Sequence, residues 1–342
     1  MTEEWNVESL RELALGYMPS GVLLAAAELD VFSVLAREPM SADQLASTLR
    51  TDLRATKILA DALSAIGLLD QRDDLYSPAP GTVDTLTVDG AKTILPFMQH
   101  HATRFRAWGR LADAVQRGQP VEIAPSIRGA EADRIAYLET MESNAQLAPE
   151  VVAALGPLEF EHLLDVGCGP GNWTVAFLNA VPQARATLYD FPDVLQIARE
   201  RVEAANLVDR ATFVEGDFTV DAALPAGADL VLVFGVAHQN SRQQNRELFA
   251  KANAALRPGG HIMVRGVVMN PDHTEPLFGA MFAILMLLRS ELGTTYSFGE
   301  TVADLEAAGF VEPRLFRHRR DIDSITRAQK PAAPQDIDGA PE

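Results

Sequence analysis

The chain has 342 residues, of which 47% are hydrophobic and 22% charged, so it is long enough and apolar enough to fold into two domains. Its formal net charge is -18, which excludes general binding to nucleic acid or to anionic membrane surfaces because like charges repel. The longest apolar stretch, residues 276–288, is shorter than the about 20 residues that span a bilayer, so we expect a buried helix there and no membrane partner.

The amino-terminal residues and the cysteine content bear on location. Residues 1–13 lack the basic-then-apolar order of a secretory signal peptide. The single cysteine, Cys168, leaves no partner for an internal disulfide, which fits a reducing compartment. We therefore expect a cytoplasmic protein.

The amino-terminal part of the chain predicts a helical module. Apolar residues recur at helical spacing over residues 22–35. Ser41 and Gln44 form a capping-box pattern, in which each side chain caps the backbone of the other, and this predicts the start of another helix. A further helix is expected over about residues 53–66, and Gly67 ends it.

Residues 68–76 predict a short hairpin around an acidic turn, so the layout is that of a winged helix. A winged helix that binds DNA carries phosphate-seeking cations on its second helix. That helix offers only Arg54 and Lys57 here, and Asp61 offsets one of them. We therefore favour a module for dimer contacts over DNA binding.

The carboxyl-terminal part of the chain has a different character. The helical pattern continues from His100 to about Leu155 with a break near residues 118–129, and short apolar strands then alternate with helical segments. The strands are expected at residues 163–166, 186–190, 211–214, 230–234 and 261–264. This alternation predicts an α/β fold with a parallel sheet covered on both faces.

These patterns divide the chain into four parts. They are a helical winged-helix domain (residues 1–98), a helical linker (99–155), an α/β domain (156–330) and a tail (331–342). The tail combines prolines and acidic residues with almost no apolar bulk, so we expect it to be disordered.

A glycine loop, which begins at Asp165, joins the first strand of the α/β domain to a helix over about residues 173–180. Gly167, Gly169 and Gly171 let the backbone turn tightly, and the helix directs its positive amino-terminal end at a ligand. The G-x-G-x-G spacing differs from the G-x-G-x-x-G of dinucleotide sites and favours a ligand held by a carboxylate and an ammonium group. A purely structural turn is the alternative.

Acidic residues follow the next two strands in register. Asp190 ends the second strand, where it can accept hydrogen bonds from both ribose hydroxyls of an adenosine group or cap the next helix. After the third strand, Asp217 can accept from an adenine amino group while Phe218 packs on the ring, although this is also a common turn. With the glycine loop, these positions predict an adenosyl site.

The phrases around these residues resemble the S-adenosylmethionine-dependent O-methyltransferases of the caffeate and acetylserotonin type. The phrases are residues 163–171, 189–194 (Tyr-Asp-Phe-Pro-Asp-Val), 216–218 and 255–260. Residues 27–32 and 62–69 look like that family's dimerisation domain, so the resemblance covers about residues 14–328. It implies a homodimer with an amino-terminal winged-helix dimerisation domain and a Rossmann-like class I methyltransferase domain.

The resemblance implies the cofactor S-adenosyl-L-methionine, with S-adenosyl-L-homocysteine as its product. The positions that match the family's cofactor site are Asp165, Gly167, Gly169, Gly171, Asp190, Phe191, Asp217, Phe218 and Phe234. Phe234 stands where some members have a lysine or arginine, so it would contact the cofactor through packing or through its backbone.

The resemblance also implies a histidine base after the fourth strand, and His238 occupies that position. An imidazole is mostly neutral near pH 7, so it can accept a proton from a hydroxyl. Gln239-Asn240 replace the family's Asp-Trp, and Gly266 stands where an orienting carboxylate is usual. Glu300 lies near the expected place of a second helper carboxylate. His238 is therefore expected to be a base, to position the acceptor only, or to serve another reaction.

The acceptor pocket is expected along the apolar helix at residues 276–288 and on the linker. The family's substrate contacts fall on Phe278, Met281, Phe282, Leu285, Met141 and Asn144. Core packing also explains much of this apolar helix, and methionine suits an adaptable pocket. Neither paired Cys/His spacing nor an acidic cluster indicates a metal.

The resemblance implies methylation of a hydroxyl on a small aromatic or polyketide-like metabolite. Carbon or nitrogen methylation stays open, and so does decarboxylation, hydroxylation or pericyclic chemistry, because the orienting carboxylate is replaced by Gly266. A winged-helix regulator that senses the cofactor is disfavoured by the acidic net charge.

Overall fold

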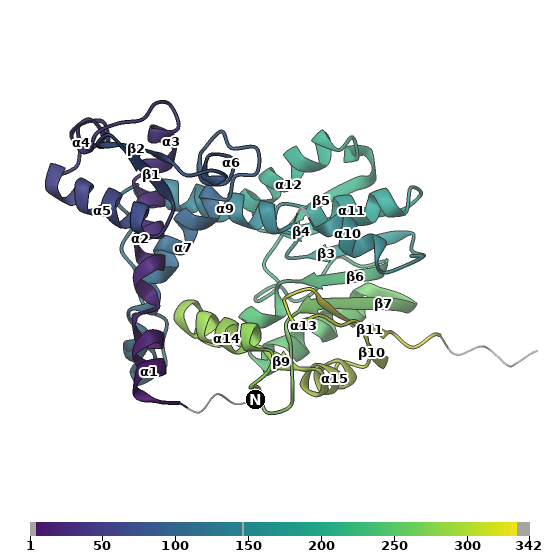
Figure 1. The fold of residues 1–342 in the computed structure, drawn as a ribbon. Helices are drawn as coiled ribbons and strands as arrows, with labels where there is room; N and C mark the ends of the chain where they lie inside the picture. Colours follow the sequence, from purple (N-terminus) through teal and green to yellow (C-terminus); the bar gives the residue numbers. More distant parts are fainter. Residues whose placement is uncertain (1–4, 146, 334–342) are drawn as a thin grey trace, which may run out of the picture. The chain divides into compact units, whose positions relative to one another are not determined.

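The computed structural model describes residues 5–145 and 147–333 of the chain (Figure 1). Residues 334–342, most of the expected tail, lie outside the described part. Among the described residues, no helix is both long and apolar enough to span a membrane.

The chain folds into two compact units. Among the described residues, unit 1 comprises residues up to 111 and residues 122–143, and unit 2 comprises residues 112–121 and the described residues from 144 onward. The segment expected as a linker, residues 99–155, therefore contributes to both units.

Unit 1 is mainly helical and contains a small hairpin. Its elements are α1 (Val7–Leu15), α2 (Tyr17–Glu28), α3 (Val31–Leu35), α4 (Ala42–Leu49), α5 (Leu53–Ala65), β1 (Leu69–Arg72), β2 (Leu75–Pro78), α6 (Thr82–Leu86), α7 (Leu95–Trp108) and most of α9 (Ala130–Ala145). The succession of α4, α5 and the β1-β2 hairpin confirms the winged-helix layout.

Local signals account for these elements. Both halves of the capping box at Ser41 and Gln44 are present at the start of α4. The hairpin turns at Asp73 and Asp74, whose φ angles of 50° and 61° are both positive, as the two-residue turn that matches strand twist requires. The acidic turn of the sequence is therefore the hairpin turn.

Tyr76 ties the hairpin to α5. Its ring is buried in the core of unit 1, and its hydroxyl donates a hydrogen bond to Asp61 at 2.5 Å. Asp61 also forms an ion pair with Lys57 at 2.8 Å. This carboxylate offsets the charge of one of the two cations that a DNA-binding α5 would present.

Unit 2 is built on a seven-stranded sheet in the order β10-β11-β7-β6-β3-β4-β5 (Figure 1). The strands are β3 (His162–Val166), β4 (Arg185–Asp190), β5 (Ala211–Glu215), β6 (Ala228–Phe234), β7 (Leu256–Gly266), β10 (Val311–Arg317) and β11 (Ser324–Gln329). The helices are α8 (Leu111–Arg117), α10 (Ala148–Ala153), α11 (Asn172–Ala180), α12 (Pro192–Ala204), α13 (Arg242–Ala255), α14 (Leu277–Arg289) and α15 (Phe298–Ala307), with short 3-10 turns η1 (Val208–Arg210) and η2 (Ala237–Gln239). A small parallel pair, β8 (Val268–Met269) and β9 (Tyr296–Ser297), lies apart from the main sheet.

The main sheet is mixed, which corrects the expectation of a parallel sheet. The five expected strands pair in parallel as β5, β4, β3, β6 and β7. β11 runs antiparallel to β7 and to β10, and neither strand was expected from the sequence. β10 contains Pro313 among charged residues, a pattern that indicates a surface loop more than a strand.

Both faces of the sheet are covered, as β6 illustrates. Leu232 belongs to a core cluster with Phe177 of α11, and Val231 belongs to the opposite cluster with Phe249 of α13. A strand buried on both faces needs consecutive apolar residues, which explains the unbroken apolar run of β6.

The order of the strands indicates where a ligand binds. From β3 the chain continues to β4 on one side, and β6 lies on the other side of β3. The carboxyl ends of β3 and β6 therefore flank the point where the strand order reverses, which is the usual ligand position in such sheets.

Candidate functional site

The glycine loop lies at this point, between β3 and α11. Gly167, Gly169 and Gly171 have positive φ angles of 68°, 53° and 78°. A Cβ on Gly167 would lie 2.7 Å from Cγ2 of Val236, so both the backbone angle and the contact exclude a side chain there. A Cβ on Gly169 would meet nothing within 4 Å, so open space lies beside the middle of the loop.

Asp190 lies at the end of β4 and is held against this loop. Its Oδ2 accepts a hydrogen bond from the backbone N–H of Gly169 at 2.9 Å, and its Oδ1 accepts from Phe191 at 2.8 Å. Burial raises the pKa of this carboxyl group. A carboxylate has about four acceptor positions, so two remain for a ligand with two adjacent hydroxyls. The ring of Phe191 is 48% exposed beside it.

Asp221 holds the loop after β5 in place, a contact that no sequence pattern indicated. Oδ2 of Asp221 accepts hydrogen bonds from the hydroxyl of Tyr189 at 2.5 Å and from the backbone of Asp217 at 3.1 Å. A Cβ on Gly216 would lie 2.4 Å from the Tyr189 ring, so glycine is required for this packing. The brace fixes the backbone that presents Asp217 and Phe218.

The side chain of Asp217 also closes its own turn. Its Oδ1 accepts hydrogen bonds from the backbone and the hydroxyl of Thr219, at 2.8 and 2.6 Å. The ring of Phe218 is partly buried, and its carbonyl accepts a hydrogen bond from Lys251 at 2.8 Å. The carboxylate of Asp217 therefore stabilises its own turn, and the same group is the one expected to bind adenine.

Two expected cofactor residues direct their side chains into the protein. Asp165 is 1% exposed, its Oδ2 accepts from the hydroxyl of Thr174 at 2.6 Å, and burial raises its pKa to about 7. The ring of Phe234 packs edge-on against Trp173 and Phe177, with centroids 5.0 and 6.0 Å away. The backbone of Phe234, rather than its ring, is thus the part left for a ligand.

His238 lies in η2, just beyond the carboxyl end of β6. Its ring meets the ring of Phe282 edge-on, with the centroids 4.9 Å apart. The Nδ1 atom is buried and has no hydrogen-bond partner among the described residues. Burial, together with the positive charges of Arg265 and Arg289, lowers the pKa of His238 to about 4. The imidazole is therefore neutral at pH 7.

A small cavity of about 30 Å³ lies beside His238, and Gly266 forms part of its wall. A Cβ on Gly266 would meet nothing within 4 Å. Gly266, the position at which the sequence led us to expect no orienting carboxylate, therefore borders open space in a cavity that His238 also lines. The cavity is also lined by three threonines, Thr295, Thr301 and Thr326.

Arg265, for which no sequence pattern indicated a role, adds positive charge near His238. Its Nε donates to Oδ1 of Asp323 at 2.8 Å, and its guanidinium lies over the Trp173 ring at 4.6 Å. Its Nη1 and the Cε1 atom of His238 both lie 4.0 Å from the point where a Cβ of Gly235 would stand. The guanidinium is thus anchored close to the site.

Glu300 has partners other than His238. Its Oε2 accepts hydrogen bonds from the backbone and the hydroxyl of Ser297, at 2.8 and 2.9 Å, in a capping box that starts α15. The same oxygen lies 2.9 Å from Nε2 of His273. In this arrangement Glu300 does not orient His238, and the helper role foreseen for it stays a prediction without support.

The aromatic residues of α14 lead to His238. Phe278 stacks on Phe282 with centroids 5.9 Å apart, and Phe282 contacts His238. Phe278 and Met281 are 47% and 45% exposed in the single chain, whereas Leu285 is 7% exposed and packs inward. The exposed residues are the ones available to an acceptor or to another chain.

Two of the expected acceptor contacts, Met141 and Asn144, lie on α9. Met141, on α9, is half-buried, and the side chain of Asn144 lies outside what the structure describes. Over residues 5–145 and 147–333, no three His, Cys, Asp or Glu side chains are placed to hold a metal ion.

Comparison with known proteins gives a family for both parts of the chain. A family model described as an O-methyltransferase domain matches residues 108–311, and one described as an O-methyltransferase dimerisation domain matches residues 11–83. The tetracenomycin polyketide synthesis 8-O-methyl transferase TcmO of Streptomyces glaucescens is 29% identical over 310 residues, 89% of this chain and 91% of that protein.

Two further relatives resemble the whole chain. Acetylserotonin O-methyltransferase of Bos taurus is 30% identical over 335 residues, 92% of this chain and 96% of that protein. The crystal structure of human N-acetylserotonin methyltransferase in complex with SAM has the same fold, with a TM-score of 0.77 at 24% identity over 97% of this chain and 100% of that one.

Proposed function

Because the chain belongs to the S-adenosylmethionine-dependent O-methyltransferase family, we propose that it methylates a hydroxyl group of a small aromatic or polyketide-like metabolite. The observation that carries this proposal is the meeting of the glycine loop, Asp190 and His238 at the carboxyl ends of neighbouring strands. The relatives methylate hydroxyl groups according to their names, and TcmO acts in polyketide synthesis.

The residues present fit S-adenosylmethionine. The open space at Gly169 would leave room for the amino-acid part of the molecule, and the free acceptor positions of Asp190 would suit a ribose diol. The braced loop at Asp217 and Phe218 suits an adenine ring. When bound, the cofactor supplies a methyl group on a sulfonium sulfur for in-line displacement.

His238 takes the proton of the acceptor hydroxyl in this proposal. The imidazole is neutral at pH 7 and lies between the apolar ring of Phe282 and the glycine-lined cavity. With a pKa of about 4 it is a weak base. Moving a proton to it from an ordinary phenol, with a pKa near 10, would cost about 8 kcal/mol. The site therefore favours an acceptor whose hydroxyl is already acidic.

The positive charges of Arg265 and Arg289 also lower the pKa of an acceptor hydroxyl bound beside His238. The charges that disfavour an imidazolium stabilise a phenolate in the same place. A hydroxyl conjugated to a carbonyl, as in many polyketide-derived rings, ionises more readily than a simple phenol. This chemistry supports a polyketide-like acceptor over an unactivated phenol.

The protein acts as a homodimer in this proposal. The dimerisation-domain match spans residues 11–83, and α1 has no buried residue in the single chain. The exposed apolar residues at this end of the chain are Trp5, Val7, Leu10, Leu13, Leu15, Tyr17 and Met18. A second copy is the expected cover for such a surface.

A second candidate is methyl transfer to carbon or nitrogen, or another reaction that keeps the cofactor site. It is favoured by one observation, the absence of a carboxylate partner for Nδ1 of His238 among the described residues. Such a reaction does not need a strong base at this position.

Product analysis distinguishes these candidates. The protein is incubated with S-adenosylmethionine labelled in its methyl group and with phenolic and polyketide acceptors, and the methylated atom is identified by mass spectrometry and NMR. The labelled methyl group on an oxygen of the product, with S-adenosylhomocysteine formed in equal amount, supports the proposal. The variant His238→Ala should lower the rate by up to about 100-fold for a weakly acidic hydroxyl and by less for an acidic one, with unchanged cofactor affinity, while the exposed His318→Ala serves as the control. Cofactor binding without turnover on any hydroxyl acceptor contradicts the proposal.

A further inference from the structure

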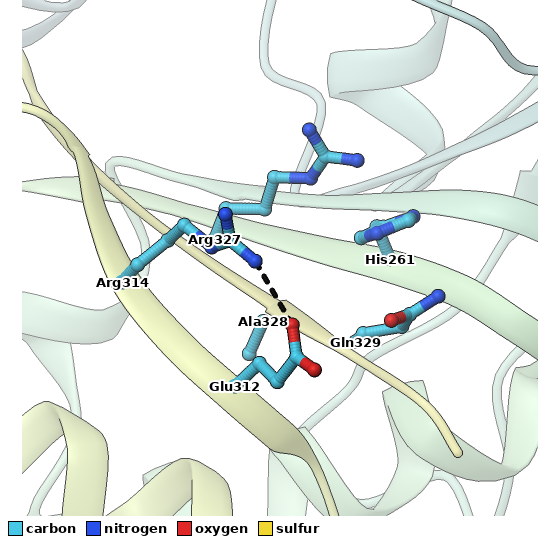
Figure 2. A pocket seen from close by; sticks show the side chains of 6 residues that line it. All are labelled: His261, Glu312, Arg314, Arg327, Ala328 and Gln329. Carbon is cyan, nitrogen blue, oxygen red and sulfur yellow. Dashed lines mark hydrogen bonds and ion pairs between the residues drawn. The ribbon is translucent and has the colours of Figure 1, made fainter.

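A cavity of about 100 Å³ lies on the antiparallel part of the sheet, over β7, β11 and β10 (Figure 2). Its wall includes His261 of β7, Arg327 and Gln329 of β11, and Glu312 and Arg314 of β10. None of these residues belongs to the site described above. From their arrangement we propose that this cavity binds a phosphate-type oxyanion.

The two arginines lie directly opposite each other in the sheet. Arg314 and Arg327 are partners in the β10–β11 register, so their side chains leave the same face at neighbouring positions. Like charges at such positions repel, and an anion between them removes the repulsion. The pair is thus arranged for a third, negatively charged group.

Arg327 has spare binding capacity. Among the described residues its guanidinium makes no hydrogen bond or ion pair, and its contact is the ring of Phe316, 5.3 Å away. Burial and the charge of Arg314 lower the pKa of Arg327, which marks an unneutralised positive charge. Its donors are free for a ligand in the cavity.

The other residues complete a positive site. Arg314 forms an ion pair with Glu312 at 2.9 Å, so the two arginines and one glutamate leave one net positive charge in a chain whose net charge is -18. His261 and Gln329 face each other across β7 and β11, and the amide of Gln329 is held by the carbonyl of Gly259 at 2.9 Å. Guanidinium, imidazole and amide groups together suit a tetrahedral oxyanion.

The size and place of the cavity define the ligand further. A volume of about 100 Å³ accommodates one phosphate group. His261 and Gly266 lie five residues apart on β7, so the cavity is about 16 Å from the wall beside His238. The ligand is a free phosphate ion or the phosphate end of a small metabolite, and its phosphate group lies away from the methyl-transfer site.

Calorimetric titration of the full chain with inorganic phosphate tests the proposal, in chloride buffer of matched ionic strength. The wild type should bind phosphate, and Arg327→Gln should weaken binding about tenfold or more. Glu312→Gln should tighten binding because it removes a carboxylate from the wall. The exposed Arg54→Gln, on α5, is the control with unchanged binding.

Thermal unfolding separates specific binding from the general stabilising effect of phosphate. Without phosphate, Arg327→Gln should unfold at the same or a higher temperature than the wild type, since the repulsion with Arg314 is gone. Phosphate should raise the unfolding temperature of the wild type more than that of Arg327→Gln. A phosphate monoester such as glycerol 3-phosphate is then added as competitor. Displacement of phosphate assigns the site to a phosphate group carried by a metabolite, and no displacement assigns it to the free ion. No binding by the wild type, or equal responses in wild type and Arg327→Gln, would overturn the proposal.

Discussion

His238 and Gly266 meet at one small cavity, and their combination determines what the acceptor must bring to the reaction. Nδ1 of His238 has no acceptor among the described residues, so no carboxylate selects its tautomer or stabilises its protonated form. A base of this kind works best with a hydroxyl that needs little help to ionise.

The pH dependence of catalysis should reflect this weak base. His238 has a pKa of about 4 and is deprotonated above about pH 5, so it should contribute no inflection near the ordinary imidazole value of about 6.5. Above about pH 5, kcat/KM should rise with ionisation of the acceptor hydroxyl. The measurement is kcat/KM against pH for two acceptors of different hydroxyl pKa. An inflection near pH 6.5 that does not move with the acceptor would contradict a depressed His238 pKa.

The substitution Gly266→Asp should place a carboxylate in the cavity that His238 lines. The position has room for a side chain, and an opposite charge near the imidazole should raise the pKa of His238 by about one unit or more. The rate with a weakly acidic phenol should rise as well. NMR titration of the His238 ring and the rate are measured together. Gly266→Asn has the same size without the charge, and an equal effect of both substitutions would refute the electrostatic explanation.

At the scale of elements, the loop between β5 and β6 owes its shape to the brace of Tyr189 and Asp221. We expect Tyr189→Phe to weaken S-adenosylhomocysteine binding about tenfold and to raise KM for the cofactor, with kcat little changed, because one partly buried hydrogen bond that supports the loop of Asp217 is lost. Titration calorimetry and steady-state kinetics give the two values. Asp221→Asn keeps both hydrogen bonds possible and should lose less. A lower unfolding temperature with unchanged cofactor affinity would show that the Tyr189–Asp221 hydrogen bond contributes to stability and not to cofactor binding.

Elements with a local signature were predictable from the sequence. The capping box at Ser41, the acidic turn at Asp73 and the apolar run of β6 each record a short-range physical requirement. The interpretation of Glu300 as a helper carboxylate overlooked such a signature, because Ser297 three residues earlier makes the same pattern. The capping-box spacing was the signal that identifies the actual partners of Glu300.

Features that depend on distant segments were not predictable. Asp221 accepts a hydrogen bond from Tyr189, and Arg265 pairs with Asp323, yet no sequence pattern links the two residues of either pair. β10 and β11 likewise gain their stability by pairing with β7 and with each other. Such contacts follow from the tertiary fold, and a single sequence contains no direct sign of them.

At the scale of the whole molecule, α1 stands out because none of its residues is buried in the single chain. The double substitution Leu10→Glu and Leu13→Glu should therefore produce a folded monomer, because these side chains are 52% and 65% exposed before association. Light scattering after size exclusion measures the mass, and circular dichroism checks the fold. Arg11→Ala on the same helix should stay dimeric. A double variant that remains dimeric would place the interface elsewhere.

The position of β11 has a consequence for how the protein is made. Residues 324–329 form a strand between β7 and β10, so β7 has no neighbour on that side until this late segment has left the ribosome. A nascent chain that stops before residue 324 already contains the glycine loop and Asp190, but it exposes an unpaired sheet edge that other chains can join. Pairing of β11 therefore removes the exposed edge of an aggregation-prone intermediate. Pausing or truncation within residues 324–329 would prolong this intermediate and make folding of the domain depend on chaperones.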